Sequence, residues 1–393
     1  MTKSFTLAIL LTLSIFTSRA QIFEDPDFER EAQKGVELLY NFQFDAAEAV
    51  FLPLKDKYPN HPAPYFFLAT NRWWQNYLSA QTPLYYKYVN SMIEKSLELN
   101  EQLADKPKLH MEYTFFQFMG NALKARVNAA QGNWWTAANA ARKIITPIKE
   151  GFQYSNTRGE FAFASGIYHY YAEVYPREFP IVKPFMVFFP DGNEELGLRE
   201  LKVAASQQHY AQIECLFYLS YIHLEERSDY ADGLIFARTL HQRFPKNTWF
   251  RADYANALIL NNQYTEARKI LHQMISTFES KSGYNTRVIH SKQSRYTSHL
   301  MIKVYQYLGK IYLFKDKRYE QAKGYFEKSE TMAKLANVEE DNLLAEDTYY
   351  IGRCYDGLGM REKAIAHYEK ALDMEGNIYI RDEAKECLKS PCR

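Results

Sequence analysis

His169 and Glu173 come closest, among the residues able to do chemistry, to the spacing of a metal or acid–base site. Four positions separate them, so on a helix both side chains would lie on one face. We expect a hydrogen-bonded pair on the helix surface rather than a metal site. The sequence contains no HExxH, GxSxG or GxxxxGK[ST] motif, and its glycines do not gather into a phosphate-binding loop. We therefore predict no catalytic residue, no cofactor and no metal, although catalytic residues can lie far apart in a sequence.

The four cysteines permit a disulfide without requiring one. Cys387 and Cys392 lie close together near the C-terminus and could pair in an oxidising compartment. Cys215 and Cys354 fall inside expected helices, where we predict small core residues. Because no cysteine has a CxxC partner or histidines at metal spacing, a zinc site is not expected.

The charge balance of the chain disfavours a nucleic-acid partner. Lys and Arg together number 48 against 47 Asp and Glu, which gives a formal net charge of +1. Binding of phosphates needs a basic surface, and this balance also predicts no polybasic patch for an anionic membrane. Aromatic residues make up 16% of the chain. Tyrosine suits half-exposed helix surfaces, because its ring packs while its hydroxyl stays in water, so helix packing is the simplest use for them.

Pairs of helices organise most of the chain. The clearest unit begins at Ala345, and Gly352 and Ala364 are small where its two helices must approach each other. Tyr368 lies at helical spacing on an inward face, and Gly359 interrupts the chain between the helices. This pattern resembles the tetratricopeptide repeat, a helix pair with a period of about 34 residues.

The same frame recurs and predicts an all-α fold. We expect one right-handed superhelix over residues 21–393, an α-solenoid of about seven or eight tetratricopeptide-type helix pairs. The expected repeats lie near residues 28–61, 62–100, 118–151, 160–208, 214–247, 248–281, 302–336 and 345–378. The repeat near 302–336 carries one extra residue in its turn, and residues 282–299 are expected to form a solvated linker.

Residues 1–20 have the pattern of an export signal. Lys3 precedes an apolar stretch too short to span a bilayer comfortably, and Ser18 and Ala20 stand at the small-residue positions before a cleavage site. Mature protein should therefore begin at Gln21. No cysteine follows the stretch, so we expect no lipoprotein anchor, and no later segment is apolar enough to span a membrane.

A segment rich in Pro and Phe, residues 174–192, interrupts the repeat near 160–208. Its four prolines, beginning with Pro176, are incompatible with a continuous helix. The segment is too apolar for a free loop, so it either folds back onto the helix pairs or meets a partner or a membrane. The candidate contact residues are Phe185, Phe188 and Phe189.

Residues 161–247 are similar to the tetratricopeptide repeat protein 39 and inclusion-body-clearance family. The likeness rests on "GIYHYY", a Pro-rich aromatic segment, "PDGNEELGLRELKVAA" and a later "YLSYIHLEER" with "FPKN". Gly192, Gly197 and Leu198 match the family pattern. The resemblance implies a helical repeat protein with one atypical repeat. Eukaryotic members are intracellular and linked to lipid-droplet and aggregate handling, so the export signal here points to an exported bacterial relative without that role.

We predict that first helices line a concave face that binds a partner. Aromatic and Arg side chains are frequent interface anchors. The candidate residues on this face are Tyr218, Trp249, Asn256, Lys310, Tyr349 and Arg353, together with Trp73 and Trp74 at the end of an earlier first helix. The expected function is a non-catalytic protein- or peptide-binding scaffold in the periplasm or outside the cell. The alternatives are a glycan or small-ligand binder and an enzyme with its site near residues 174–192.

Overall fold

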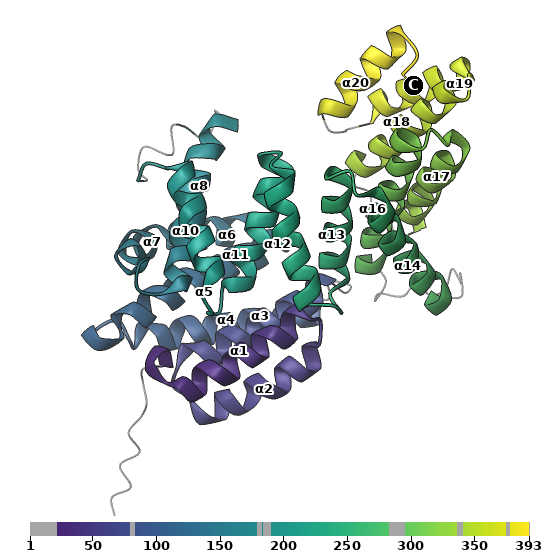
Figure 1. Cartoon of the computed structure of the whole chain (residues 1–393). Helices are drawn as coiled ribbons and strands as arrows, with labels where there is room; N and C mark the ends of the chain where they lie inside the picture. The colour runs from purple at the N-terminus through teal and green to yellow at the C-terminus, as the bar shows by residue number, and fades with distance from the viewer. Residues whose placement is uncertain are drawn as a thin grey trace, which may run out of the picture.

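The computed structural model describes residues 22–78, 83–178, 183, 190–282, 295–335, 341–374 and 378–392. Within these ranges every regular element is a helix, and the helices stack in pairs as an all-α solenoid (Figure 1). The pairs are α1 (Pro26–Tyr40) with α2 (Phe44–Lys57), α3 (Pro62–Leu78) with α4 (Pro83–Glu101), α5 (His110–Ala130) with α6 (Trp134–Arg142), α8 (Gly159–Glu178) with α10 (Glu194–Ser206), α11 (Gln212–Tyr221) with α12 (Tyr230–Arg243), α13 (Thr248–Leu260) with α14 (Tyr264–Ser282), α16 (Arg295–Lys310) with α17 (Tyr319–Leu335), and α18 (Asp341–Gly357) with α19 (Arg361–Asp373).

Shorter elements complete the described part of the chain. They are η1 (Ile22–Glu24), η2 (Pro107–Leu109), α7 (Ile145–Gly151), η3 (Phe152–Tyr154) and the C-terminal α20 (Ile378–Lys389). The eight pairs traced in these ranges confirm the predicted all-α solenoid.

Most turns inside the helix pairs contain a residue with a positive φ angle. Six of them contain a residue with φ between +55° and +76°, and these residues are Phe42, Gly132, Ser228, Asn262, Lys317 and Gly359. Two first helices also end in a wider π turn, η5 (Ile222–Glu226) after α11 and η6 (Ile311–Lys315) after α16. A π turn accommodates one additional residue, which explains the extra residue predicted in the turn of the repeat near 302–336.

Small residues let the two helices of a pair approach each other, as the sequence predicts. A Cβ at Gly352 would lie 2.7 Å from the ring of Tyr368, and Ala364 is fully buried at the same joint. In the α8–α10 pair the backbones themselves are close, because a Cβ at Gly197 would lie 2.5 Å from the backbone nitrogen of Tyr170. Larger side chains at these positions would push the helices apart.

Two helix ends differ from expectation. Helix α3 continues to Leu78, so Trp73 and Trp74 lie within it rather than at its end. Helix α8 contains Pro176 and continues to Glu178, although we expected the prolines to end it earlier. A proline lacks the N–H that would bond the carbonyl four residues earlier, so α8 contains Pro176 in its last described turn at the cost of one backbone hydrogen bond.

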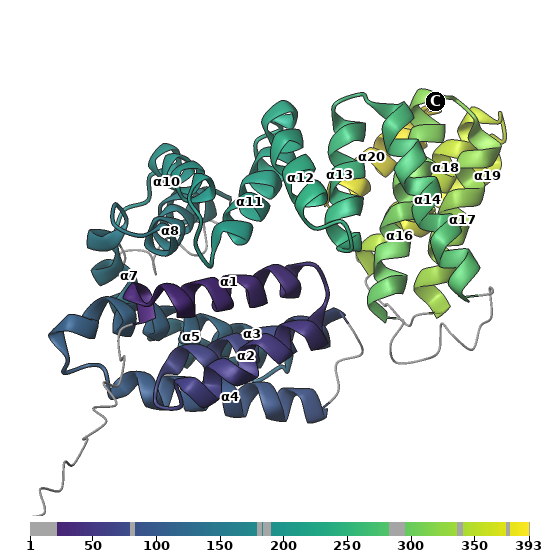
Figure 2. The same cartoon turned by 60° about the horizontal axis from the view of Figure 1, so that its bottom comes forward.

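The solenoid folds back so that its first pair lies along its middle. Figure 2 shows α1 running beneath α8, α10, α11 and α12. The end of α1 is fastened to the turn between α12 and α13, where Asn247 Nδ2 donates to the Tyr40 carbonyl over 2.8 Å and Arg243 pairs with Glu37. A single apolar cluster joins both parts, since it includes Phe28 and Phe116 as well as Ile213.

Helix α20 closes the C-terminal end. A disulfide joins Cys387 and Cys392, the pairing that the sequence permitted. The backbone N–H of Cys392 donates to Asp356 over 2.9 Å, and that buried carboxylate also pairs with Arg361 at 2.9 Å. Both other cysteines are free and buried, as predicted.

Candidate functional site

Four successive first helices present the same three positions on one face. The positions follow an i, i+4, i+7 spacing, which keeps side chains on one side of a helix. They are Glu214, Tyr218 and Tyr221 on α11, Trp249, Asp253 and Asn256 on α13, Lys303, Tyr307 and Lys310 on α16, and Glu346, Tyr350 and Arg353 on α18. We name these twelve residues the first-helix stripe. Most are half-buried, so their polar atoms lie at the boundary between core and solvent.

One residue predicted on the binding face of α18 does not belong to the stripe. Tyr349 was expected on the binding face, but only 1% of it is exposed and it belongs to the C-terminal core. The equivalent residues of the two preceding first helices, Ala252 and Gln306, are buried as well. One step along a helix turns the side chain by about 100°, so the neighbouring Tyr350 takes the stripe position, where 9% of it is exposed.

Side chains of successive helices touch along the stripe. The Lys303 ammonium lies 4.9 Å from the centre of the Trp249 ring, which connects α16 to α13. The Lys310 ammonium lies 2.6 Å from a Glu346 carboxylate oxygen, which connects α16 to α18. Burial alone would lower the pKa of Lys310, but the adjacent carboxylate raises it above its ordinary value. These contacts make the stripe one continuous surface across three helix pairs.

Arg353 has donor capacity left at the end of the stripe. Its guanidinium lies 4.8 Å from the centre of the Phe314 ring, and one of its Nη groups donates weakly to the Tyr349 hydroxyl over 3.4 Å. Its Nε is buried without a hydrogen-bond partner among the described residues. A guanidinium held against a ring can receive an acceptor group from a ligand at little conformational cost.

Two carboxyl groups of the stripe have altered acidity. Burial raises the pKa of Glu214 to about 7, although a hydrogen bond from the Tyr40 hydroxyl acts in the opposite direction. Burial also raises the pKa of Asp253 to about 7, against the opposing charge of Lys303. Glu214 lies where the first pair meets the middle of the solenoid, whereas Asp253 on α13 lies near Lys303 on α16. Near neutral pH each carboxyl is therefore partly protonated, and the charge of the stripe changes with pH.

Trp74 lies near the α11 end of the stripe. Its ring centre is 6.1 Å from that of Tyr40, which bonds to Glu214, and the Arg126 guanidinium lies 5.3 Å from the Trp74 ring. Trp73 was predicted to reach the same surface, but it is 2% exposed and packs in a separate cluster. Adjacent residues point in different directions on a helix, so only one tryptophan of the pair faces the stripe.

The chain matches a described protein family over two stretches. Residues 224–279 and 300–374 match models described as "Tetratricopeptide repeat". The chain carries tetratricopeptide repeats. No curated protein matches it significantly.

Several solved structures are similar to this tetratricopeptide repeat protein at low identity. A structure titled "Human IFIT1 dimer with m7Gppp-AAAA" shares 14% identity, with 84% of this chain and 67% of that chain covered and a TM-score of 0.42. The human IFIT1 dimer with PPP-AAAA shares 13% identity, with 84% of this chain and 68% of that chain covered and a TM-score of 0.40. The P58(IPK) TPR domain shares 16% identity, with 92% of this chain and 98% of that chain covered and a TM-score of 0.24.

His169 and Glu173 are both hydrogen-bonded, but not to each other. His169 Nδ1 lies 2.8 Å from a Glu200 oxygen, and Glu173 accepts the backbone N–H of Glu194 over 2.6 Å. The expectation of a satisfied surface pair was therefore wrong in its partners, because α10 packs onto α8 and supplies both of them. No group of three potential metal ligands gathers within the described ranges.

The insertion of the repeat protein is attached to α8 at its return end. Tyr168 donates its hydroxyl to the Pro190 carbonyl over 2.7 Å, and the Asn193 N–H donates to the His169 carbonyl over 2.8 Å. Phe185, Phe188 and Phe189 lie outside the described residues, so the predicted contacts of these side chains stay predictions.

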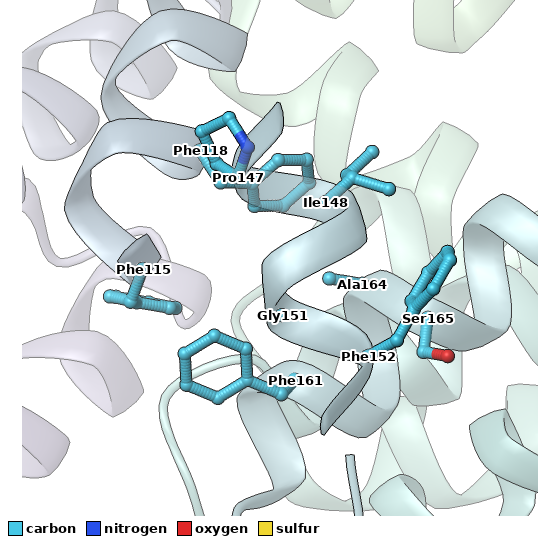
Figure 3. Close-up of a pocket in the computed structure, with 9 residues that line it drawn as sticks. All are labelled: Phe115, Phe118, Pro147, Ile148, Gly151, Phe152, Phe161, Ala164 and Ser165. Carbon is cyan, nitrogen blue, oxygen red and sulfur yellow. The ribbon is translucent and has the colours of Figure 1, made fainter. Parts of the chain in front are cut away.

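Two hollows elsewhere do not form better candidate sites. Figure 3 shows the first, an apolar gap between α5, α7 and α8 that includes Phe115, Phe152 and Phe161. Its volume is about 10 Å³, which barely admits one water molecule. The second is an open cleft of about 550 Å³ between α1 and residues 208–210. Its buried carboxylate, Glu160, is already paired with Arg158 over 3.2 Å.

Sequence reasoning found only part of this surface. It placed Tyr218, Trp249, Asn256, Lys310 and Arg353 on the binding face, and all five belong to the stripe. It missed the carboxylates and several aromatic and basic members, which are Glu214, Tyr221, Asp253, Lys303, Tyr307, Glu346 and Tyr350. The signal that could have found them is the recurrence of polar and aromatic types at i, i+4 and i+7 in successive first helices.

Proposed function

We propose that this tetratricopeptide repeat protein is a non-catalytic scaffold that binds a protein or peptide along the first-helix stripe. The observation that supports this most is the stripe itself. Four successive helices keep polar and aromatic residues half-buried at equivalent positions, where apolar residues would add to the core. Aromatic and Arg side chains such as Trp249, Tyr307 and Arg353 are common anchors of protein interfaces.

The charges of the stripe favour a partner with both signs of charge. Its cations are Lys303, Lys310 and Arg353, and its acidic groups are Glu214, Asp253 and Glu346. A surface that binds nucleic acid needs an excess of cations to neutralise phosphates, which this stripe lacks. A polypeptide supplies backbone hydrogen bonds and mixed side chains, so it matches the stripe better.

A glycan or small ligand is the second candidate. The supporting observation is the row of half-buried rings along the stripe, which are Tyr218, Trp249 and Tyr307. Aromatic rings at the boundary of core and solvent can pack against the apolar faces of other molecules. An enzyme with a site near residues 174–192 is the third candidate. Among the titratable groups described beside that segment, His169 and Glu200 bond to each other over 2.8 Å.

We propose that the protein is exported and acts in the periplasm or outside the cell. The N-terminal signal pattern supports export, and a disulfide between Cys387 and Cys392 fits an oxidising compartment. The chain would then be an exported bacterial relative of the family to which residues 161–247 are similar. N-terminal sequencing of protein from its native host should begin at Gln21, and an intact Met1 would contradict the proposal.

Selection from a random peptide library on the mature chain tests the binding proposal. The affinities of the selected peptides are then measured by calorimetry for the wild type and for Lys303→Ala/Tyr307→Ala/Arg353→Ala. We expect the triple variant to bind at least tenfold more weakly, because truncation of interface anchors typically costs about 1–2 kcal/mol or more each.

A matched control changes exposed residues away from the stripe, Val203 on α10 and Ile235 on α12. The variant Val203→Ala/Ile235→Ala should bind the selected peptides like the wild type. Equal affinity of the stripe variant and the control would refute peptide binding at the stripe. A glycan array screened with the same three proteins covers the second candidate, which predicts glycan binding that only the stripe variant loses.

A further inference from the structure

Two adjacent tryptophans project from the surface of α6. Trp134 is 70% exposed and Trp135 is 87% exposed, the highest values among the large apolar residues that the structure describes. Exposing such large rings to water is unfavourable, and an exposed apolar patch commonly marks an interaction surface. Both rings stand at the start of a nine-residue helix.

Helix α6 buries little of its own surface. Only Ala137 and Ala140 of the helix are buried, on the side that packs against α5. The contact with the next pair is made by α7 and η3, which pack against α8. The remaining face of α6 is therefore available, and it comprises Trp134, Trp135, Ala138, Asn139, Ala141 and Arg142, all exposed. We name these six residues the α6 face.

The α6 face lies in a part of the chain that has cations and no acidic residue. From Tyr113 to Lys149 the sequence contains five Lys or Arg and no Asp or Glu. The α5 cations of this segment already have partners, because Lys124 lies 3.9 Å from Glu94 and Arg126 lies over Trp74. Arg142 and the following Lys143 are exposed at the end of α6, so the positive charge of the segment reaches solvent there.

Tryptophans and cations share one side of α6. Trp135 and Arg142 are seven positions apart, which places them two turns apart on the same stripe of the helix, with Ala138 and Asn139 between them. A helix with rings at one end, cations at the other and small residues between can lie flat on an apolar, negatively charged boundary. The whole chain is nearly neutral, so its composition does not reveal this local excess of positive charge. For that reason we predicted no membrane-binding patch from the composition.

We propose that the α6 face docks on the surface of a membrane that contains anionic lipid. Tryptophan rings favour the interface between lipid headgroups and hydrocarbon, and each nearby Lys or Arg adds attraction to an anionic leaflet. The docking is peripheral, with α6 parallel to the surface. None of the described helices combines the length and apolarity needed to cross a membrane. Nucleic acid would require more cations than the α6 face presents.

Vesicle co-sedimentation of the full mature chain tests the proposal. One set of vesicles contains phosphatidylcholine alone, and the other contains roughly one third phosphatidylglycerol. We expect binding to the anionic vesicles and weak binding to the neutral ones. Arg142→Gln/Lys143→Gln should weaken binding to anionic vesicles about thirtyfold, from roughly fivefold per cation. Trp134→Ser/Trp135→Ser should abolish binding, together with the blue shift of tryptophan fluorescence that vesicles cause in the wild type.

The control variant Val203→Ser/Ile235→Ser exposes polar groups on α10 and α12 instead, and it should bind vesicles like the wild type. All changed residues are exposed, so helical circular dichroism should be the same for every variant. The proposal fails if the wild type ignores anionic vesicles or if the α6 variants bind them normally. It also fails if the α6 changes abolish binding of a single-stranded RNA oligonucleotide or self-association while vesicle binding is retained.

Discussion

The N-terminal pairs and the C-terminal pairs use the same helix-pair unit in opposite ways. In the N-terminal part, α1 is enclosed between its own neighbours and the middle of the solenoid, and Phe28 and Leu39 are buried in a cluster that reaches α11 and α13. From α13 to α18 the first helices keep one face polar and half-exposed, as the stripe residues Asp253 and Lys310 show. The face of a first helix thus becomes core where the chain folds back onto it and remains polar and half-exposed where it does not.

A hydrogen bond joins the two regions at their boundary. At this boundary Tyr40 of the first pair bonds to Glu214 of the stripe, across 174 positions of sequence. Contact with the first pair helps to remove the Glu214 carboxyl from water, and this burial raises its pKa to about 7.

The largest expected effect comes from removing one buried ring in each region. Phe116 and Phe326 are both fully buried, and replacing either by Ala should cost about 3–5 kcal/mol of unfolding free energy. The regional consequences should differ. Phe116→Ala should speed hydrogen exchange in α1, α5 and α11 together, because one cluster connects them.

Phe326→Ala is the matched change, since Phe326 stacks on Tyr350 at 5.1 Å within the C-terminal cluster. It should speed exchange from α16 to α19 and leave α1 unaffected. Hydrogen exchange monitored by mass spectrometry separates the two patterns. If both variants accelerate exchange uniformly along the chain, the two regions are not distinct units.

Much of the fold was predictable from the sequence because it depends on local spacing. Small residues such as Gly352 and Ala364 mark helix joints, and Gly359 marks a turn, so one repeat defines the frame for the others. The fold-back was not predictable, because contacts such as Asn247 with Tyr40 join residues 207 positions apart. No local pattern encodes such a contact.

Two residues that the sequence placed on the binding face, Tyr349 and Trp73, are buried instead. Tyr349 and Tyr350 are adjacent and identical in type, so composition alone cannot say which of them lies deeper in the core. Ala252 and Gln306 are buried at the equivalent positions of the preceding first helices, so comparison of successive repeats assigns Tyr349 to the core. Its hydroxyl there lies 3.8 Å from the Cys387 sulfur.

A second change tests the helix joint of the C-terminal region. Ala364 is fully buried where α19 meets α18, so Ala364→Trp should overpack that joint and cost about 1–3 kcal/mol. Thermal melting followed by helical circular dichroism measures the loss. An exposed alanine on the same solenoid, Ala138 of α6, provides the control, and Ala138→Trp should melt like the wild type. A wild-type melting temperature for Ala364→Trp would show that the repeat frame is misplaced.

A smaller effect should appear in the pH dependence of stability at the boundary of the two regions. Glu214 and Asp253 have pKa values of about 7 in the folded protein, above their values in an unfolded chain. The folded state therefore binds more protons between about pH 4 and pH 7, so these groups make stability fall as pH rises through that window. Glu214→Gln/Asp253→Asn should flatten this slope and stabilise the protein by about 1–2 kcal/mol at pH 8.

Urea unfolding of wild type and double variant at pH 5 and pH 8 measures the difference. The single change Glu346→Gln, at a stripe carboxylate paired with Lys310, serves as the control and should not stabilise the protein at pH 8. Identical pH profiles for the wild type and the double variant would mean that burial does not raise the pKa values of these two carboxyl groups.

The most direct test of the central claim is the footprint of a selected peptide on the mature protein. Hydrogen exchange with and without saturating peptide locates the bound segment along the chain. Binding at the first-helix stripe predicts slowed exchange in α13, α16 and α18, with α1 unchanged because its apolar face is already buried. Protection confined to helices outside the stripe, with none in α13, α16 or α18, would contradict it.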